Sequence, residues 1–280
     1  MGLGPLCRTG FDPAQGGQGN SFGVTMSANV LACRLGSYKQ FVETAWTHLP
    51  SIGVGHIETA VPTADEVADL RARLEASGLK VSSFQVRLDL SDERVVETAA
   101  ESFVVCEQFG VSRVFTSVKT GDGSRERAYD RLRGIGEAAR KRGVIVVIET
   151  HPDLATNGDV AAETMRAVDH PNVRVNFDTA NIYFYNEGAD AVGELRKALP
   201  YVEAVHLKDT RGGVGQFDFP TLGEGVVDFP TVFRLLNDRG FTGPFTMELE
   251  GTKGVERDEE QIKQHVADSV AYLRRSGCIE

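Results

Sequence analysis

The feature that most constrains the fold of this chain is a regular alternation of short apolar runs with longer amphipathic runs. Eight apolar or β-branched runs have the length of strands, and the segments between them have helical periodicity. Strands that alternate with helices pair in parallel through right-handed crossovers. We predict parallel strands at Phe22–Met26, Ile52–Glu58, Lys80–Val86, Arg113–Ser117, Val144–Glu149, Val173–Asp178, Glu203–Leu207 and Pro244–Glu250.

The ends of the predicted helices carry the same signals throughout the chain. Gly78, Gly110, Gly143 and Gly240 each end a helical run just before a strand, where a left-handed residue favours glycine. The predicted N-terminal caps are Thr63 (with Glu66), Ser91, Ser124 and Asp228. This even spacing over 280 residues predicts one (β/α)8 barrel of the TIM type, which usually needs about 250 residues.

An open, doubly wound sheet is the alternative architecture for alternating strands and helices. Such a sheet usually carries a G-x-G-x-x-G turn after its first strand, but residues 27–30 are Ser-Ala-Asn-Val. The first 20 residues contain a Gly-Gly-Gln-Gly run and few apolar side chains. We therefore predict a flexible N-terminal arm over residues 1–20 and a single TIM-barrel domain over residues 21–280.

Composition narrows the classes of partner. The formal net charge is −10, from 40 acidic and 30 basic residues, so we expect no nucleic-acid partner, because a polyanion would be repelled. No stretch reaches the about 18 apolar residues that span a bilayer, and the N-terminus lacks the apolar run of a secretory signal. The four cysteines form no C-x-x-C pair, which favours a reducing, cytoplasmic location.

Four polar residues occupy corresponding places at the ends of the last four predicted strands: Glu149, Asp178, His206 and Glu248. The C-terminal ends of parallel barrel strands share one rim, so these side chains are expected to meet there. Taken singly, an acidic residue at a strand end is usually a helix cap or a loop hydrogen-bonder. Together, three carboxylates and one imidazole form a mostly hard donor set. That set favours one Mn2+ or Mg2+ ion, with Co2+ or Zn2+ as alternatives.

The segments around these residues resemble the xylose isomerase-like TIM-barrel superfamily. The similarity extends from Phe22 to about Leu273, and its motifs are VIETHPD, NFDTAN, VHLKDTR, LGEGVVDF and GFTGPFTMELEG. That group includes tagatose/psicose-type 3-epimerases, other sugar isomerases, hydroxypyruvate isomerase, inosose dehydratase and endonuclease IV. In its 3-epimerase branch, the four matching positions bind one divalent metal. The resemblance implies that Glu149 and Glu248 also transfer protons, whereas Asp178 and His206 are ligands alone.

One departure from the family pattern bears on the number of metal ions. Many relatives have a histidine three residues after the aspartate, where this chain has Asn181. Residues 212–229 contain no histidine either, so the three-zinc site of endonuclease IV is not expected. The resemblance therefore implies a single metal ion.

Further residues are candidate substrate contacts: Glu58, His151, Asn181, Lys208 and Arg211. His151 and Lys208 each lie two residues beyond a predicted ligand, on the same side of the strand. Lys208 and Arg211 suit a phosphate, carboxylate or enolate oxygen, or alternatively an ion pair with Asp209 or Glu250. Glu58 suits a sugar hydroxyl, or alternatively a cap for the turn after its strand.

The expected function is that of an isomerase or epimerase acting on a sugar or keto-acid. A metal ion that bridges a ketone and its neighbouring hydroxyl would stabilise an enediolate while a glutamate removes the carbon-bound proton. A dehydratase of the inosose or 3-dehydroshikimate type begins with the same step and is one alternative, and a non-catalytic sugar-binding barrel is another. The aromatic residues 183–185 either wall the pocket or form a subunit contact, which leaves a homo-oligomer open.

Overall fold

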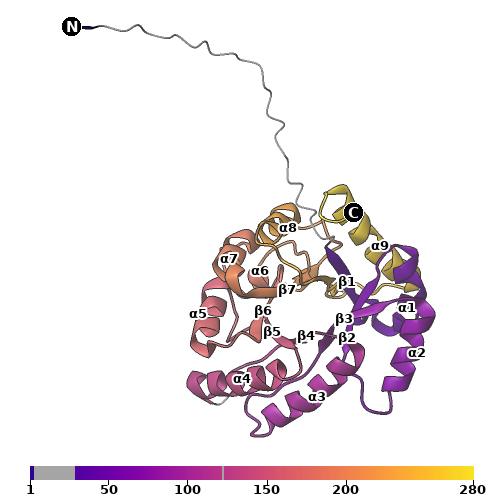
Figure 1. Ribbon diagram of the computed structural model, residues 1–280. Helices are drawn as coiled ribbons and strands as arrows, with labels where there is room; N and C mark the ends of the chain where they lie inside the picture. The colour runs from indigo at the N-terminus through magenta and orange to yellow at the C-terminus, as the bar shows by residue number, and fades with distance from the viewer. Residues whose placement is uncertain (3–28, 122) are drawn as a thin grey trace.

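Eight parallel strands close into a barrel that is surrounded by helices (Figure 1). The computed structural model describes residues 1–2, 29–121 and 123–280, and the structural statements below concern these residues. In order around the barrel, the strands are β1 (Val30–Arg34), β2 (His56–Ala60), β3 (Lys80–Gln85), β4 (Arg113–Thr116), β5 (Ile145–Glu149), β6 (Val173–Asp178), β7 (Val202–Leu207) and β9 (Pro244–Met247). The predicted (β/α)8 TIM barrel is therefore confirmed.

Helices follow the strands and cover the outside of the barrel (Figure 1). They are α1 (Val42–Ser51), α2 (Val67–Ser77), α3 (Val95–Phe109), α4 (Arg125–Arg140), α5 (Gly158–Val168), α6 (Asn181–Tyr185), α7 (Ala191–Ala198), α8 (Phe229–Asp238) and α9 (Glu259–Arg275), with short 3-10 helices η1 (Leu35–Phe41) and η2 (Leu199–Tyr201). Two short strands, β8 (Asp218–Phe219) and β10 (Gly251–Thr252), form a separate antiparallel pair.

The first barrel strand differs from its prediction. β1 is Val30–Arg34, and its backbone pairs with β2 on one side and with β9 on the other. Phe22–Met26 is therefore wrong as the first strand of the barrel. Those residues, and the boundary at residue 20 between the expected arm and the barrel, lie outside the described residues. A strand buried on both faces shows no alternation of polar and apolar residues, so the run Val-Leu-Ala-Cys gave no periodic signal.

Helix ends follow the predicted signals in part. The side chains of Ser124 and Asp228 cap α4 and α8 as predicted, and the four glycines predicted to end helices have φ between 65° and 76°. Ser91 does not cap α3, because its amide and hydroxyl both bind the Asp89 carboxylate and the helix begins at Val95. Thr63 donates from its amide and its hydroxyl to the carboxylate of Glu66 in a turn just ahead of α2. The pair therefore does not cap this helix.

Alternation along the strands explains why charged residues meet at one end of the barrel. The interior contains a cluster of buried apolar residues, Phe115, Val147 and Ala204. Side chains on one face of a strand recur every second residue, so the interior position after Val147 is Glu149 and the one after Ala204 is His206. The side chains that face the barrel interior thus change from apolar to charged over two residues of each strand. The ring of Phe115 packs against that of His206, with centroids 4.5 Å apart.

The long loop after β7 is held by one buried carboxylate. Asp209 accepts backbone hydrogen bonds from Gly223 at 2.8 Å, Gly225 at 2.9 Å and Val227 at 3.2 Å. Burial raises the pKa of this carboxyl, although the N–H groups oppose the shift. A Cβ on Gly225 would lie 2.2 Å from Oδ1 of Asp209, so only glycine allows the loop to close on the carboxylate.

We expect Asp209→Ala to lower the free energy of unfolding by about 2–4 kcal/mol, because several buried N–H groups lose their acceptor at once. Asp209→Asn keeps one acceptor of the same shape and should cost less. Urea unfolding followed by circular dichroism measures both, with the exposed Asp238→Ala as the control, which should stay within about 0.5 kcal/mol. An Asp209→Ala protein as stable as this control would contradict the role given to the carboxylate.

Candidate metal centre

The four predicted ligands come together at the C-terminal end of the barrel. Glu149 and Asp178 end β5 and β6, His206 lies in β7, and Glu248 follows β9 directly. In the ladder, Asp178 pairs with His206, and the amide of Glu248 donates to the carbonyl of Leu207 at 3.0 Å. One ligand atom from each of the four side chains lies within 4.8 Å of the others, and all four residues are buried.

His206 presents one ring nitrogen to the other ligands and the second to a carboxylate behind it. Its Nδ1 lies 3.2 Å from Oε1 of Glu149 and 3.4 Å from Oε2 of Glu248. Its Nε2 lies 3.0 Å from Oε1 of Glu58, and Ser83 donates to Glu58 at 2.6 Å. A carboxylate on the far nitrogen fixes the ring orientation of a metal-binding histidine. The structure therefore places Glu58 behind His206, away from the cavity wall where a substrate contact would lie.

Asp178 divides its two oxygens between the backbone and the site. Its Oδ1 accepts from the amides of Ala180 at 2.9 Å and Asn181 at 2.8 Å. Its Oδ2 is buried and accepts no hydrogen bond from a described residue. The Lys208 ammonium is 2.9 Å from that oxygen, but this ion pair lacks the alignment of a hydrogen bond, so a lone pair stays available. Burial raises the pKa of Asp178, and Lys208 opposes the shift.

Cations surround Glu248. Nζ of Lys208 lies 2.8 Å from Oε2 of Glu248 and 2.8 Å from Oε2 of Glu250. Arg34 forms an ion pair with the other oxygen of Glu248 and donates to Oε1 of Gln85 at 3.0 Å. Arg34 ends β1, the one strand that the sequence misplaced, so its role at this site was missed. A correct assignment of β1 would have revealed this role, because the last residue of a parallel strand lies at the rim where the site forms.

Burial and neighbouring charge act against each other on the ligands. Burial alone would raise the pKa of Glu149, but the hydrogen bond and charge of His206, together with Lys208, lower it to about 2. Burial alone would lower the pKa of His206, but Glu58 and Glu149 raise it to about 9. Glu149 is therefore ionised at neutral pH. A metal ion binds neutral imidazole, so its binding at this site must release the proton of His206.

These observations fit a divalent cation. Three buried carboxylates and the Nδ1 atom of His206 supply mostly hard donors, and Oδ2 of Asp178 keeps a lone pair for a ligand. Hard oxygen donors with one imidazole suit Mn2+ and Mg2+. We therefore propose that Glu149, Asp178, His206 and Glu248 hold one such ion.

A cavity of about 240 Å3 opens next to these residues, and His151, Asn181 and Lys208 all line it. Nε2 of His151 lies 2.8 Å from the hydroxyl of Tyr185, which lines the same cavity. Asn181 donates from its side-chain amide to the carbonyl of Thr150 at 3.0 Å. These three candidates are placed where a substrate could reach them.

Arg211 is not brought to the cavity. Its side chain is 49% exposed, and it pairs with Asp218 at 2.6 Å and with Glu224 at 3.5 Å. The alternative prediction, an ion pair of Arg211 with Asp209 or Glu250, is therefore also wrong, because Arg211 pairs with Asp218 and Glu224 instead. Loop closure after β7 turns the arginine outward, which the sequence spacing could not show.

The comparisons with known proteins agree with this geometry. A family model described as xylose isomerase-like TIM barrel matches residues 46–275. A closed parallel barrel with ligand-type residues at its C-terminal rim is the architecture of that class. The chain belongs to the xylose isomerase-like TIM barrel family, as its sequence motifs predicted. Among the described helices, none combines the length and the apolar character needed to cross a membrane.

Dehydratases are among the curated proteins that this chain resembles in sequence. An inosose dehydratase from Serratia proteamaculans is 29% identical over 142 residues, which is 45% of this chain and 47% of that protein. A 3-dehydroshikimate dehydratase from Bacillus anthracis is 23% identical over 175 residues, which is 60% of this chain and 61% of that protein. The chain spans about half the length of the inosose dehydratases that it matches.

Solved structures with a similar fold include an epimerase and a magnesium complex. A xylose isomerase-like TIM barrel protein from Mycobacterium smegmatis, in complex with magnesium, has a TM-score of 0.70 at 21% identity and covers 89% of this chain and 96% of its own. A D-psicose 3-epimerase with D-tagatose from Clostridium cellulolyticum H10 has a TM-score of 0.71 at 16% identity, with coverages of 88% and 98%. Such identities establish the fold alone. The relatives thus include both isomerases or epimerases and dehydratases.

We expect Glu58→Ala to weaken Mn2+ binding about 10–100-fold, because His206 loses the carboxylate that fixes its ring. Glu58→Gln should have a smaller effect, since an amide oxygen still accepts from the ring. Isothermal titration of chelator-treated protein measures both affinities, and Arg211→Ala, whose side chain lies outside the cavity, is the control. If Glu58→Ala binds Mn2+ as tightly as that control, Glu58 does not position the histidine.

Proposed function

We propose that this protein is a divalent-metal-dependent enzyme that removes a proton from the carbon next to the carbonyl of a polyhydroxylated ketone, and that the reaction ends in loss of water. The observation that carries this proposal is the environment of Glu248. Both of its oxygens are held by cations, Arg34 on one and Lys208 on the other, and neighbouring cations oppose protonation of a carboxylate.

Proton transfer would then fall to residues other than Glu248. A bound Mn2+ or Mg2+ ion would polarise the carbonyl and stabilise the negative charge that develops on its oxygen. Glu149 is ionised and lies at the edge of the cavity, so it can accept the carbon-bound proton. His151 lines the same cavity and is hydrogen-bonded to Tyr185, so it can donate a proton to the departing hydroxyl. Lys208 and Asn181 would bind the substrate's oxygens.

Epimerisation or isomerisation is the second candidate. It is favoured by the fold similarity to a D-psicose 3-epimerase and by the presence of two glutamates among the four proposed ligands. In that reaction Glu149 and Glu248 would form the proton-transfer pair, as the family resemblance implies, and Glu248 would have to be released from its two cations. The sequence similarity to dehydratases supports dehydration instead. A cytoplasmic location and a homo-oligomeric state stay predictions.

The test is to incubate the chelator-treated protein, with and without added Mn2+, in deuterated buffer with inososes, 3-dehydroshikimate, ketohexoses and hydroxypyruvate. We expect loss of water and new C=C absorbance from a cyclic hydroxyketone, only when Mn2+ is present. A deuterated epimer without new absorbance would reject dehydration in favour of the second candidate. Absence of any turnover would leave a sugar-binding barrel.

Two variants separate the assigned roles. We expect Glu149→Gln to lower the rates of both deuterium exchange and water loss by about 1,000-fold or more, since the base is removed. We expect His151→Phe to slow water loss by about 100-fold or more while exchange at the carbon continues. Arg211→Ala is the control and should retain full turnover. Equal loss of both steps in His151→Phe would contradict its role as the acid.

A further inference from the structure

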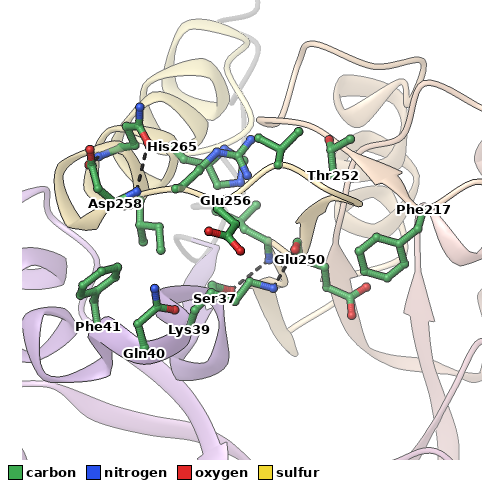
Figure 2. Close-up of a pocket in the computed structure, with 15 residues that line it drawn as sticks. Ser37, Lys39, Gln40, Phe41, Phe217, Glu250, Thr252, Glu256, Asp258 and His265 are labelled. Atoms are coloured by element: carbon green, nitrogen blue, oxygen red, sulfur yellow. Dashed lines mark hydrogen bonds between the residues drawn. The ribbon is translucent and has the colours of Figure 1, made fainter.

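A second cavity, which we call the outer cleft, opens beside the candidate metal centre (Figure 2). Its walls are η1, after β1, and the segment from β10 into α9. Its volume is about 660 Å3, against about 240 Å3 for the cavity next to the proposed ligands. Ligand pockets usually measure ~300–1,000 Å3. The inner cavity alone is therefore small for a substrate, and the outer cleft has the usual size.

The two cavities are neighbours in the structure. Phe217 and Glu250 line both of them. A third cavity of about 190 Å3 shares Arg34 and Glu248 with the inner cavity and Lys39 with the outer cleft. A molecule bound beside the four proposed ligands would therefore lie next to the outer cleft.

His265 lines the outer cleft and carries a polar atom without a partner in the described part of the chain. It is 5% exposed and lines the cleft wall from α9. Its Nδ1 lies 2.9 Å from the hydroxyl of Thr221, whereas its buried Nε2 has no hydrogen-bond partner among the described residues. Burial, followed by the charge of Arg257, lowers the pKa of this ring to about 4. A buried polar atom without a partner is costly, and a neutral ring suits a neutral hydroxyl group.

The charges and aromatic side chains of the cleft point to the same class of ligand. The cleft is lined by two basic residues, Lys39 and Arg257, and by three acidic residues, Glu250, Glu256 and Asp258. It therefore has no excess of positive charge to hold a phosphate or carboxylate. Figure 2 shows Phe41 and Phe217 on opposite sides of the cleft, with Gln40 on the wall formed by η1. Aromatic faces combined with neutral hydrogen-bonding groups are suited to a hydroxylated ring.

Lys39 lines both the outer cleft and the third cavity, and its backbone conformation is unusual. Its φ is 54° and its ψ is −128°, a combination that residues with a side chain rarely adopt. Its ammonium donates to the carbonyl of Glu250 at 2.7 Å, which ties η1 to the segment after β9. Strain of this kind is concentrated at ligand sites. The residue therefore shapes the wall that the outer cleft shares with the third cavity.

We propose that the outer cleft binds a second sugar-like ring, so that the substrate is a two-ring polyhydroxylated molecule whose ketone-bearing ring lies at the metal residues. The position of the ketone rests on the proposed function. Binding of the second ring rests on the cleft itself.

The test measures binding without reaction. Wild-type protein with Mg2+ is titrated with cellobiose and maltose as two-ring probes, and with glucose and myo-inositol as single-ring probes, by isothermal titration and saturation-transfer NMR. We expect at least one two-ring probe to bind about tenfold more tightly than the single-ring probes, a difference of about 1.4 kcal/mol. Saturation transfer should reach both rings of that probe.

Variants locate the second ring. We expect Gln40→Ala and His265→Leu each to weaken two-ring binding about fivefold or more, because each removes a polar group from the wall of the cleft. Gln108→Ala, an exposed glutamine on α3, is the matched control and should bind like wild type. If His265→Leu fails to fold by circular dichroism, the exposed Gln40→Ala decides.

Two results would overturn the proposal: two-ring probes that bind no more tightly than single-ring ones, including no measurable binding of either, or a Gln40→Ala protein that binds them like wild type. These probes carry no ketone at the ring that would react, so the outcome is independent of turnover. A two-ring preference together with a two-ring ketone that binds and is not dehydrated would reject the proposed reaction and keep the cleft site. Dehydration of single-ring ketones without that preference would do the reverse.

Discussion

The charged end of the barrel depends on mutual compensation between buried charges. Four carboxylates, those of Glu58, Glu149, Asp178 and Glu248, are buried within one layer of the barrel, and carboxylates without partners would not stay ionised there. His206, Lys208 and Arg34 supply the opposite charge. Each of these cations lies at the end of a strand. Closure of the barrel therefore also brings the cations next to the buried carboxylates and neutralises their charge. A divalent ion would complete this balance with the Nδ1 side of His206 facing it.

The loops beyond the strands convert this charged layer into cavities of defined shape. Asp209, the residue after Lys208, gathers three amides of the following loop, and the antiparallel pairing of β8 with β10 joins that loop to the segment after β9. Phe217 and Phe219 are thereby held at the cavity next to the metal residues. The loop after β7 and the segment after β9 therefore line both the inner cavity and the outer cleft.

Much of the architecture could be predicted because strand periodicity is a local property. The predicted ends of β5, β6, β7 and β9 bring Glu149, Asp178, His206 and Glu248 to one rim, and the fold family followed from motifs at those same positions. The first strand was predicted at the wrong residues, because Leu31–Cys33 are buried in succession and show no alternation. Arg34 was lost with it. Glu58 was recognised as a strand-end residue, but only the packed barrel places it behind His206.

The sequence by itself determined the parallel barrel, the four-residue donor set and the family, because each depends on residue type and spacing along the chain. Only the tertiary structure decided which groups neutralise those donors, that Arg211 faces outward, and that a larger cleft lies next to the cavity at the proposed ligands. These features depend on distances between segments far apart in the chain, such as Arg34 with Glu248 and Lys39 with Glu250. No local pattern records such distances, since barrel closure and loop packing set them.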